Sequence, residues 1–225
     1  MADQWKSCRD TLQCHLINYD RLEAVQYALS LLENGTVTVP ELYEQILAPS
    51  LNSILVSREA AYDMIWREHV MTGIVRGVVE SALPYVLKER NQHRLPGFTQ
   101  KVMLACPEEE YHELGLRMGA DFYTIAGYDV VFIGSNTPKH NILSAAKHLQ
   151  PDIIGIGVSN YLNLIQLDWI IPKLRQEMKQ GVKIYLGGSA FKHTGRTHQD
   201  FQADGIVNTF DEILALRGHA YEDRV

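Results

Sequence analysis

Cysteine is scarce in this chain, which has three such residues among 225, Cys8, Cys14 and Cys106. An odd number at these irregular separations provides no disulfide framework, so we expect free thiols and a reducing compartment. Cys8, Cys14 and His15 could in principle hold a metal ion, but their spacing fits no common zinc pattern. The three cysteines are therefore interpreted as ordinary thiols.

Long hydrophobic runs are also missing, and no segment stays apolar for the length that a bilayer requires. The first residues, Met1 to Lys6, lack the apolar stretch of a signal peptide. We therefore expect a cytoplasmic protein without a membrane partner. Clusters of Lys and Arg are lacking as well, and the formal net charge is -6. This charge balance argues against nucleic acid as a direct partner.

The composition that remains is that of a globular protein, with 46% hydrophobic and 21% charged residues. The length allows one large domain or two modest ones. In the first part of the chain, apolar residues recur at intervals of three and four, which predicts helices over 18–34, 40–56 and 58–89. Pro49 and Pro84 should kink or break the second and third of these helices.

The pattern changes after residues 90–99, a polar stretch with Pro96-Gly97 that is typical of a linker. Beyond it, short apolar runs alternate with helical patterns, which indicates a parallel sheet. Strands are expected at 101–106, 129–133, 152–158 and 183–186 and near 205–207, with helices at 111–126, 139–149, 164–180, 191–202 and 210–218. The predicted fold class is α/β: an N-terminal helical bundle over residues 1–92, then a flavodoxin-like, doubly wound, five-stranded parallel sheet over residues 93–225.

A polar segment at the end of the first expected strand contains Glu110, His112 and Gly115. The Glu110 carboxylate could accept a proton from one imidazole nitrogen of His112, fix the tautomer and raise the basicity of the other nitrogen. Gly115 would let a bulky partner approach the backbone. The alternative is a surface acidic cluster that caps a helix, with a histidine nearby by chance.

Two further loops follow the third and fourth expected strands, Ser159-Asn160-Tyr161-Leu162 and Gly187-Gly188-Ser189. The carboxyl ends of parallel strands meet at one edge, so these loops should converge with the segment around His112. Small residues, hydroxyls and amides there would form a slot for a long ligand tail. The alternatives are a helix-capping serine at Ser159 and a tight turn at the glycine pair.

The pattern Glu110-x-His112-x-x-Gly115 resembles the Asp/Glu-x-His-x-x-Gly signature of cobalamin-binding domains. The segments after the third and fourth strands resemble that family's Ser-x-Leu and Gly-Gly segments. The likeness covers residues 100–218, and residues 15–92 resemble the helical cap of the same family. The family includes corrinoid methyl-carrier proteins and cobalamin-dependent light-responsive regulators.

The resemblance implies that His112 is the lower axial ligand of cobalt and that the nucleotide tail enters the slot. Ser159 would hydrogen-bond the displaced benzimidazole, and Gly187 and Gly188 would line the path of the tail. The full set of residues implied in cofactor binding is Glu110, Tyr111, His112, Glu113, Leu114, Gly115, Ser159, Asn160, Leu162, Gly187, Gly188, Ser189, Trp66 and His69.

The helical cap would contribute Glu68-His69 and Trp66 to the upper face of the cofactor. In the similar regulators a Trp lies ten positions before the Glu-His pair, where this chain has Arg58. This difference argues against an adenosyl upper ligand and favours methylcobalamin or hydroxocobalamin. Alternatively, Trp66 packs in the core and His69 is a satisfied buried histidine.

The resemblance implies a stand-alone corrinoid methyl carrier that serves separate methyltransferases and is not itself an enzyme. The alternative is a cobalamin- or light-responsive sensor that acts through signalling proteins. Too few residues precede the cap for a DNA-binding domain, so a direct transcription factor is not expected. Cofactor storage, a flavodoxin-like domain for another nucleotide and homo-oligomer formation stay open.

Overall fold

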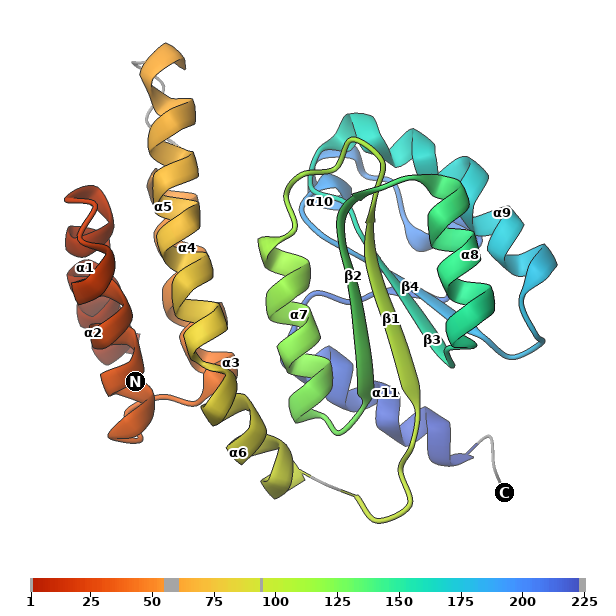
Figure 1. Ribbon diagram of the computed structural model, residues 1–225, viewed down its shortest axis with the longest axis horizontal. Coiled ribbons are helices and arrows are strands. Elements are labelled where there is room, and N and C mark those ends of the chain that lie inside the picture. Colours follow the sequence, from red (N-terminus) through yellow and green to blue (C-terminus); the bar gives the residue numbers. More distant parts are fainter. Residues whose placement is uncertain (1, 55–60, 94, 223–225) are drawn as a thin grey trace. The chain divides into compact units, whose positions relative to one another are not determined.

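The computed structural model describes residues 2–54, 61–93 and 95–222 (Figure 1). The packing separates the chain into two compact units, Met1–Glu89 and Arg90–Val225. The domain boundary after residue 92 stays a prediction.

The first unit is helical. Its elements are α1 Ala2–Ile17, α2 Arg21–Glu33, α3 Val39–Glu41, the π-helical turn Leu42–Leu47, α4 Ala48–Ile54, α5 Ala61–Ser81 and the first part of α6 Leu83–His93. The core is formed by buried side chains from most of these helices, including Leu12, Ala28, Ile46 and Val75. The three predicted helices are confirmed where they are described; residues 55–60 lie outside the described part.

The helix α1 was not predicted. It has three buried residues on one face, Cys8, Leu12 and Leu16, four positions apart. Such a thin apolar stripe over 16 residues gives little periodic signal, because the stripe of a typical amphipathic helix is wider. Packing against the rest of the unit stabilises α1 where its own pattern is weak.

The predicted break at Pro84 is confirmed, whereas the kink or break expected at Pro49 stays a prediction. Pro49 is preceded by the π-helical turn, in which the Ala48 N–H donates to the carbonyl of Tyr43, five residues back. Pro84 is the second residue of α6, so the missing proline N–H falls in the first turn of a new helix. The helical segments Ile65–Ser81 and Leu83–His93 are bent by 48° at this break.

Among the residues that the structure describes, no single helix is long and apolar enough to cross a membrane. The bent pair Ile65–Ser81 and Leu83–His93 meets the requirements of length and composition when its two halves are counted together.

The second unit contains the predicted sheet, with five parallel strands in the order β2-β1-β3-β4-β5. The strands are β1 Lys101–Pro107, β2 Asp129–Thr137, β3 Ile153–Gly157, β4 Lys183–Gly187 and β5 Gly205–Ile206. The strand order is that of a flavodoxin-like doubly wound sheet, so the predicted fold class is confirmed. The helices of the unit are α7 Leu114–Ile125, α8 Lys139–Leu149, α9 Leu167–Glu177, α10 Ala190–Thr194 and α11 Phe210–Glu222.

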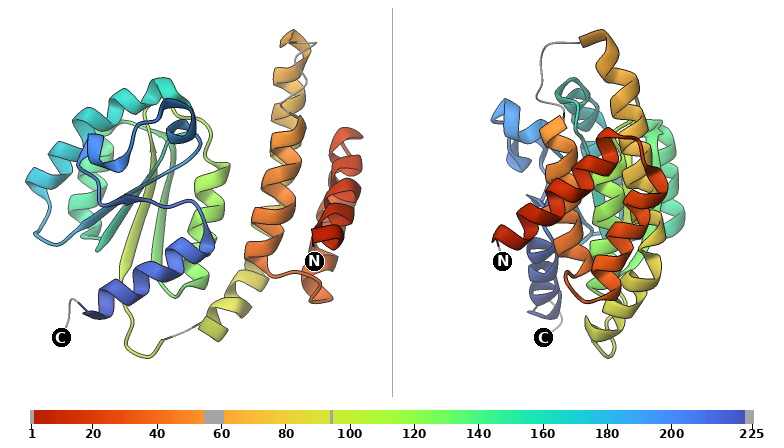
Figure 2. Two further views of the ribbon diagram at one scale, coloured as in Figure 1. Left: turned by 180° about the vertical axis from the view of Figure 1, so that it is seen from behind. Right: turned by 90° about the vertical axis from the view of Figure 1, so that its left-hand side faces the viewer.

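The two faces of the sheet are packed differently (Figures 1 and 2). One face forms the larger core, in which Met103, Ile154 and Ile184 pack against α8 and α9. The opposite face carries α7 and α11. Alternate strand residues reach that second face, and two of them, Gly155 and Gly157, have no side chain. The side chains of Leu104 and Leu116 reach into the space that a Cβ would take at these two glycines.

Three helix predictions are wrong in part. The helix expected from residue 111 begins at Leu114, so His112 lies in the loop before it. The helix expected from residue 164 begins as the 3₁₀ turn Tyr161–Gln166 and continues as α9. The helix expected over 191–202 is replaced by α10 and the 3₁₀ turn His198–Phe201. Gly195 separates these two pieces with φ of 66°, a left-handed conformation that ends a helix.

Candidate functional site

The site lies at the point where the strand order reverses, at the carboxyl ends of β1 and β3. These strands are neighbours, but the chain continues from β1 to β2 on one side and from β3 to β4 on the other. The loops that follow them diverge and leave a crevice between them, which is where open α/β sheets bind ligands. Glu110 and His112 are in the first loop, and Ser159 and Asn160 are in the second.

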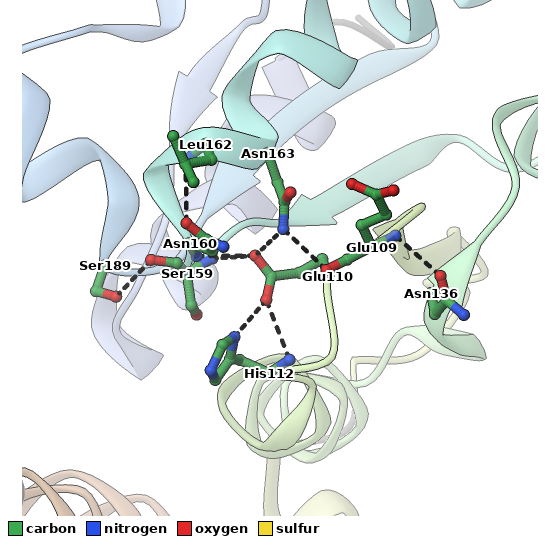
Figure 3. Close-up of polar contacts among 9 residues, drawn as sticks. All are labelled: Glu109, Glu110, His112, Asn136, Ser159, Asn160, Leu162, Asn163 and Ser189. Carbon is green, nitrogen blue, oxygen red and sulfur yellow. Dashed lines mark hydrogen bonds and ion pairs between the residues drawn. The ribbon is translucent and has the colours of Figure 1, made fainter. Parts of the chain in front are cut away.

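Glu110 joins the two loops (Figure 3). Its side chain is fully buried, and one carboxylate oxygen accepts from the backbone N–H of His112 at 3.1 Å and pairs with the imidazole Nδ1 at 2.6 Å. The other oxygen accepts from the backbone N–H groups of Ser159 and Asn160, both at 2.9 Å, and from the side-chain amide of Asn163 at 3.3 Å. A buried carboxylate with this many donors is held rigidly.

The hydrogen bonds also keep Glu110 charged. Burial alone raises the pKa of the Glu110 carboxyl group, because desolvation disfavours the anion. The amide of Asn160, the ring and amide of His112 and the amide of Ser159 outweigh burial and lower the pKa below its ordinary value. The anion is therefore the form that this crevice stabilises. An acidic cluster on the surface, the alternative reading of this segment, is wrong for Glu110.

The backbone before Glu110 is strained. Glu109 has φ of 66° and Asn136 has φ of 48°, both in the left-handed region that side chains rarely adopt. The Glu109 N–H donates to the Asn136 side chain at 2.9 Å, and the Asn136 N–H donates to the Glu110 carbonyl at 2.8 Å (Figure 3). The Asn163 amide also donates to the Glu109 carbonyl at 3.1 Å. These bonds fix the turn that directs Glu110 into the crevice.

His112 presents one nitrogen to the outside. Its side chain is 59% exposed although its Nδ1 is tied to the buried carboxylate. Because Glu110 is an anion, the pairing assigns the Nδ1 proton to the imidazole, and the lone pair of Nε2 remains available. Within the described part of the chain, Nε2 makes no hydrogen bond. The side chain therefore offers one ring nitrogen to a partner from outside the fold.

Exposed apolar side chains extend from both of these loops, one of them from the residue directly before His112. Tyr111 is 66% exposed, and in the 3₁₀ turn after β3 the exposed fractions are 59% for Tyr161, 63% for Leu162 and 69% for Ile165. Glu110 holds the two loops together, so these side chains belong to one edge of the sheet. Large apolar groups left exposed around a polar site are typical of a surface that receives a ligand or a partner.

A cavity of about 150 Å³ runs from His112 beneath α7. It is lined on the helix side by Gly115, Leu116, Gly119, Phe122 and Tyr123, and on the sheet side by Leu104, Gly155, Gly157, Tyr185 and Gly187. An added Cβ at Gly115 or Gly119 would have no described atom within 4 Å. Both glycines therefore leave open space along one face of the helix, four residues apart.

The glycines on the sheet side are required by close contacts. An added Cβ at Gly188 would lie 2.2 Å from the carbonyl oxygen of Val158, and φ of this residue is 103°. At Gly187 the same atom would lie 2.9 Å from the Val207 carbonyl oxygen. The Gly188 N–H donates to the Asn208 side chain at 2.9 Å. The pair therefore lets the loop after β4 approach β3 and β5 while it lines the cavity.

The other predicted residues have distinct positions. Ser159 does not cap the following turn, because Asn160 does so by accepting from the Leu162 N–H at 3.1 Å. The Ser189 hydroxyl donates to the Ser159 carbonyl at 3.3 Å. Glu113 lies at the start of α7, where its carboxylate accepts from the Ser135 N–H at 2.9 Å.

Leu114 is buried in α7 and lies outside the cavity lining. In the first unit, Trp66 is 47% exposed on α5 and His69 is exposed as well, so the alternatives that placed both in the core are wrong. Arg58 is outside the described residues. Within the described residues, no group of three His, Cys, Asp or Glu side chains could hold a metal ion.

Several site residues were missed by the sequence analysis. Asn163 and Asn136, which hold the Glu110 turn, lie a few positions from the predicted loops, and their role depends on strand register. Gly119, Tyr123 and Tyr185 line the cavity but were hidden within an amphipathic helix and an apolar strand. A glycine inside a helix, where it costs stability, was the signal that could have revealed Gly119.

Comparison with known proteins gives one family match. Residues 100–216 match the family model of the B12 binding domain. The chain is similar to the HTH-type transcriptional repressor CarH of Myxococcus xanthus, with 26% identity over 75% of this chain and 53% of the repressor. It is also similar to a corrinoid protein of Desulfitobacterium hafniense, with 26% identity over 52% of this chain and 53% of that protein. The chain thus spans about half the length of these two relatives.

A third relative is the dimethylamine corrinoid protein of Methanosarcina barkeri, with 26% identity over 69% of this chain and 71% of that protein. Among solved structures, the monomethylamine corrinoid protein of Methanosarcina barkeri superimposes with a TM-score of 0.76. That match covers 94% of this chain and 97% of the other at 15% identity, and it supports the fold.

Proposed function

Because the chain belongs to the B12 binding domain family, we propose that its second unit binds a cobalamin, with His112 as the lower ligand of cobalt. The observation that carries the proposal is the pairing of His112 Nδ1 with the buried Glu110 carboxylate at 2.6 Å, beside a glycine-lined cavity. Each feature has an ordinary structural explanation alone. Together they provide an exposed nitrogen ligand and a recess that starts beside it.

The residues present fit such a cofactor. Open space at Gly115 and Gly119 allows a ligand tail to lie along α7, where any larger side chain would intrude. The exposed Tyr111, Tyr161 and Leu162 offer apolar surface for a macrocycle above the crevice. We propose that Ser159, Asn160, Gly187, Gly188 and Ser189 line the entrance for the tail, as the family pattern implies.

The residues of this chain would bind and orient the cofactor. Glu110 keeps the proton on Nδ1 of His112 and fixes the ring, so Nε2 faces outward with a free lone pair. The low pKa of Glu110 keeps this arrangement charged and stable within the fold. When bound, a corrinoid supplies cobalt chemistry, the acceptance and release of a methyl group. Glu113 and Leu114 then act on the cofactor indirectly, through the start of α7.

We propose the role of a methyl carrier that serves separate methyltransferases, in which the chain itself performs no catalysis. The similarity to a dimethylamine corrinoid protein over 69% of this chain supports this role. We keep Trp66 and His69 as proposed contacts of the cofactor because both are exposed on α5. Methylcobalamin or hydroxocobalamin is the proposed form, since Arg58 occupies the position at which similar regulators have tryptophan. The cytoplasm is the proposed location.

The second candidate is a cobalamin- or light-responsive sensor that signals through protein contacts. The similarity to the repressor CarH over 75% of this chain supports it, and so does Glu68-His69 in the cap. A carrier loaded with methylcobalamin passes the methyl group to an acceptor in a lysate of the source organism. A sensor instead changes its elution volume in size-exclusion chromatography when illuminated or when the ligand is exchanged. The two measurements separate the candidates.

The binding proposal is tested by absorption spectra of the wild type and of His112→Ala, each reconstituted with cobalamin. The wild type should give a red, cobalt-containing protein with the spectrum of a histidine-ligated corrinoid. His112→Ala should lose that spectrum and bind at least about tenfold more weakly, because it removes the proposed ligand, and loss of a ligand's hydrogen-bond partner alone typically costs about 10- to 100-fold. His148→Ala is the matched control, because His148 is exposed on α8. Identical spectra for wild type and His112→Ala would contradict the proposal.

A further inference from the structure

Asn163 is a buried polar residue in the 3₁₀ turn after β3, with an exposed fraction of 5%. Its side-chain nitrogen donates to the Glu110 carboxylate at 3.3 Å and to the Glu109 carbonyl at 3.1 Å (Figure 3). An amide NH₂ group has two hydrogens, so it can serve both acceptors at once. Asn163 therefore ties the turn before His112 to the segment after β3.

Two acceptors that converge on one buried position require a side chain with two donors. The carboxylate and the carbonyl both lack hydrogens, so the amide oxygen of Asn163 cannot face them, and this fixes the orientation of the amide group. Aspartate at this position would place a second negative charge beside Glu110. Leucine would leave both acceptors without this donor. The contacts with Glu109 and Glu110 thus explain why the position carries an amide.

The donors to the second oxygen of the Glu110 carboxylate are of two kinds. Ser159 and Asn160 contribute backbone amides, each at 2.9 Å, which any residue except proline would provide. Among the described residues, the Ser159 hydroxyl makes no hydrogen bond with this carboxylate. The Asn163 contact is the one that comes from a side chain, so a single substitution can remove it and leave the other two in place.

The contact with Glu109 adds a second effect. Glu109 has φ of 66°, and a strained residue persists only where its neighbours hold it. Loss of the Asn163 bond would let this residue relax and shift the adjacent Glu110 carboxylate. That carboxylate pairs with Nδ1 of His112 at 2.6 Å, so the direction of the imidazole would change with it.

We propose that Asn163 is a positioning residue for His112: by holding the Glu109–Glu110 turn, it sets how firmly the imidazole is presented to the cobalt of a bound corrinoid. This inference rests on the proposed function. Asn163 lies outside the cavity lining, and it acts through Glu110. Without its amide a cobalamin should still bind, because the cavity is unchanged, but His112 should ligate cobalt in only part of the molecules.

The test compares the wild type, Asn163→Ala, His112→Ala and the double variant, each titrated with cobalamin. Asn163→Ala should give an absorption spectrum between those of the wild type and His112→Ala. Its dissociation constant should rise roughly three- to tenfold, less than the about 10- to 100-fold typical for a direct partner of a metal ligand. In the His112→Ala background the same substitution should change the dissociation constant by less than about twofold. A merely structural role would weaken binding in both backgrounds.

A second measurement needs no cofactor. Nitrogen NMR of the free protein should show the His112 imidazole in one tautomer, with the proton on Nδ1. This signal is identified by its absence from His112→Ala. Asn163→Ala should give signals averaged between the two tautomers. Asn141→Ala is the control, because Asn141 is exposed on α8, and it should behave as the wild type in both measurements.

Thermal melting should show that each variant is folded, and Asn163→Thr, which keeps one donor, should lie between the wild type and Asn163→Ala in both measurements. The inference alone fails if the wild type shows histidine ligation and both Asn163 variants match it in spectrum and tautomer. It also fails alone if Asn163→Ala weakens binding equally with and without His112. If the wild type and His112→Ala give identical spectra, the proposed function fails and this inference fails with it.

Discussion

Replacing Gly119 with alanine should separate the stability of the fold from the binding of a ligand tail. Gly119 lies inside α7 and lines the cavity, and an added Cβ would meet no described atom within 4 Å. Alanine is more favourable than glycine within a helix by about 1 kcal/mol. For a chain of this size, that gain corresponds to a rise of roughly 2–4 °C in melting temperature. The free protein should therefore become more stable.

The same methyl group should weaken binding of cobalamin, because it enters space that the tail would occupy. Forcing one extra carbon into a packed site costs about 1–3 kcal/mol, which is roughly a 5- to 150-fold increase in the dissociation constant. The assay is titration with cobalamin followed by absorption or calorimetry. Cobinamide is the ligand control, since it lacks the tail and should bind equally to Gly119→Ala and to the wild type.

Gly77→Ala provides the protein control. Gly77 lies within α5 in the first unit, and an added Cβ would be 3.8 Å from the side chains of Arg21 and Val25, an ordinary contact. It should raise stability by a similar amount without an effect on binding. If Gly119→Ala binds cobalamin as tightly as the wild type does, the tail does not occupy this cavity. If its melting temperature falls, the space beside α7 is not open as described.

Two further results are expected. Glu110→Ala should lower the free energy of unfolding, measured in urea, by about 3–5 kcal/mol, because it leaves the amides of Ser159 and Asn160 without their acceptor. Glu110→Gln should lower the free energy of unfolding by less. Equal stability of the wild type and both variants would contradict the role of this carboxylate. At pH 8 a thiol reagent should quickly label only the exposed Cys14, and it should label all three cysteines after denaturation. Cys8 is buried, and burial together with the charges of Glu110 and Glu113 raises the pKa of the Cys106 thiol to about 12. Rapid labelling of Cys14→Ser would contradict this expectation.

The strands could be predicted because each is a short apolar run between turn signals. The run 101–106 became β1, and its burial on both faces explains the absence of alternation. The convergence of the loops at Glu110, Ser159 and Gly187 followed from parallel topology alone. The pairing of Glu110 with His112 could be predicted because the two residues are only two positions apart.

What could not be predicted depends on contacts between distant segments. The strand register that brings Asn163 and Asn136 to the Glu110 turn cannot be inferred from any local sequence pattern. The cavity could not be predicted either, because the position of Tyr123 in the periodic pattern of an amphipathic helix is the same whether its side chain packs in the core or lines a cavity. The helix expected over 191–202 failed for a different reason, since Gly195 interrupts a stretch that is otherwise compatible with a helix.

The bonding of the Glu110 carboxylate limits how this site can be transferred to another protein. The six residues from Glu110 to Gly115 look like a self-contained segment that could be moved to another protein. The second oxygen of the Glu110 carboxylate, however, accepts from backbone amides 49 and 50 positions later in the chain. Grafted alone into a foreign scaffold, this segment would carry an acid that lacks three of its five donors, and the imidazole would lose its fixed orientation. A designer would have to transplant the turn after β3 together with it, in the same register.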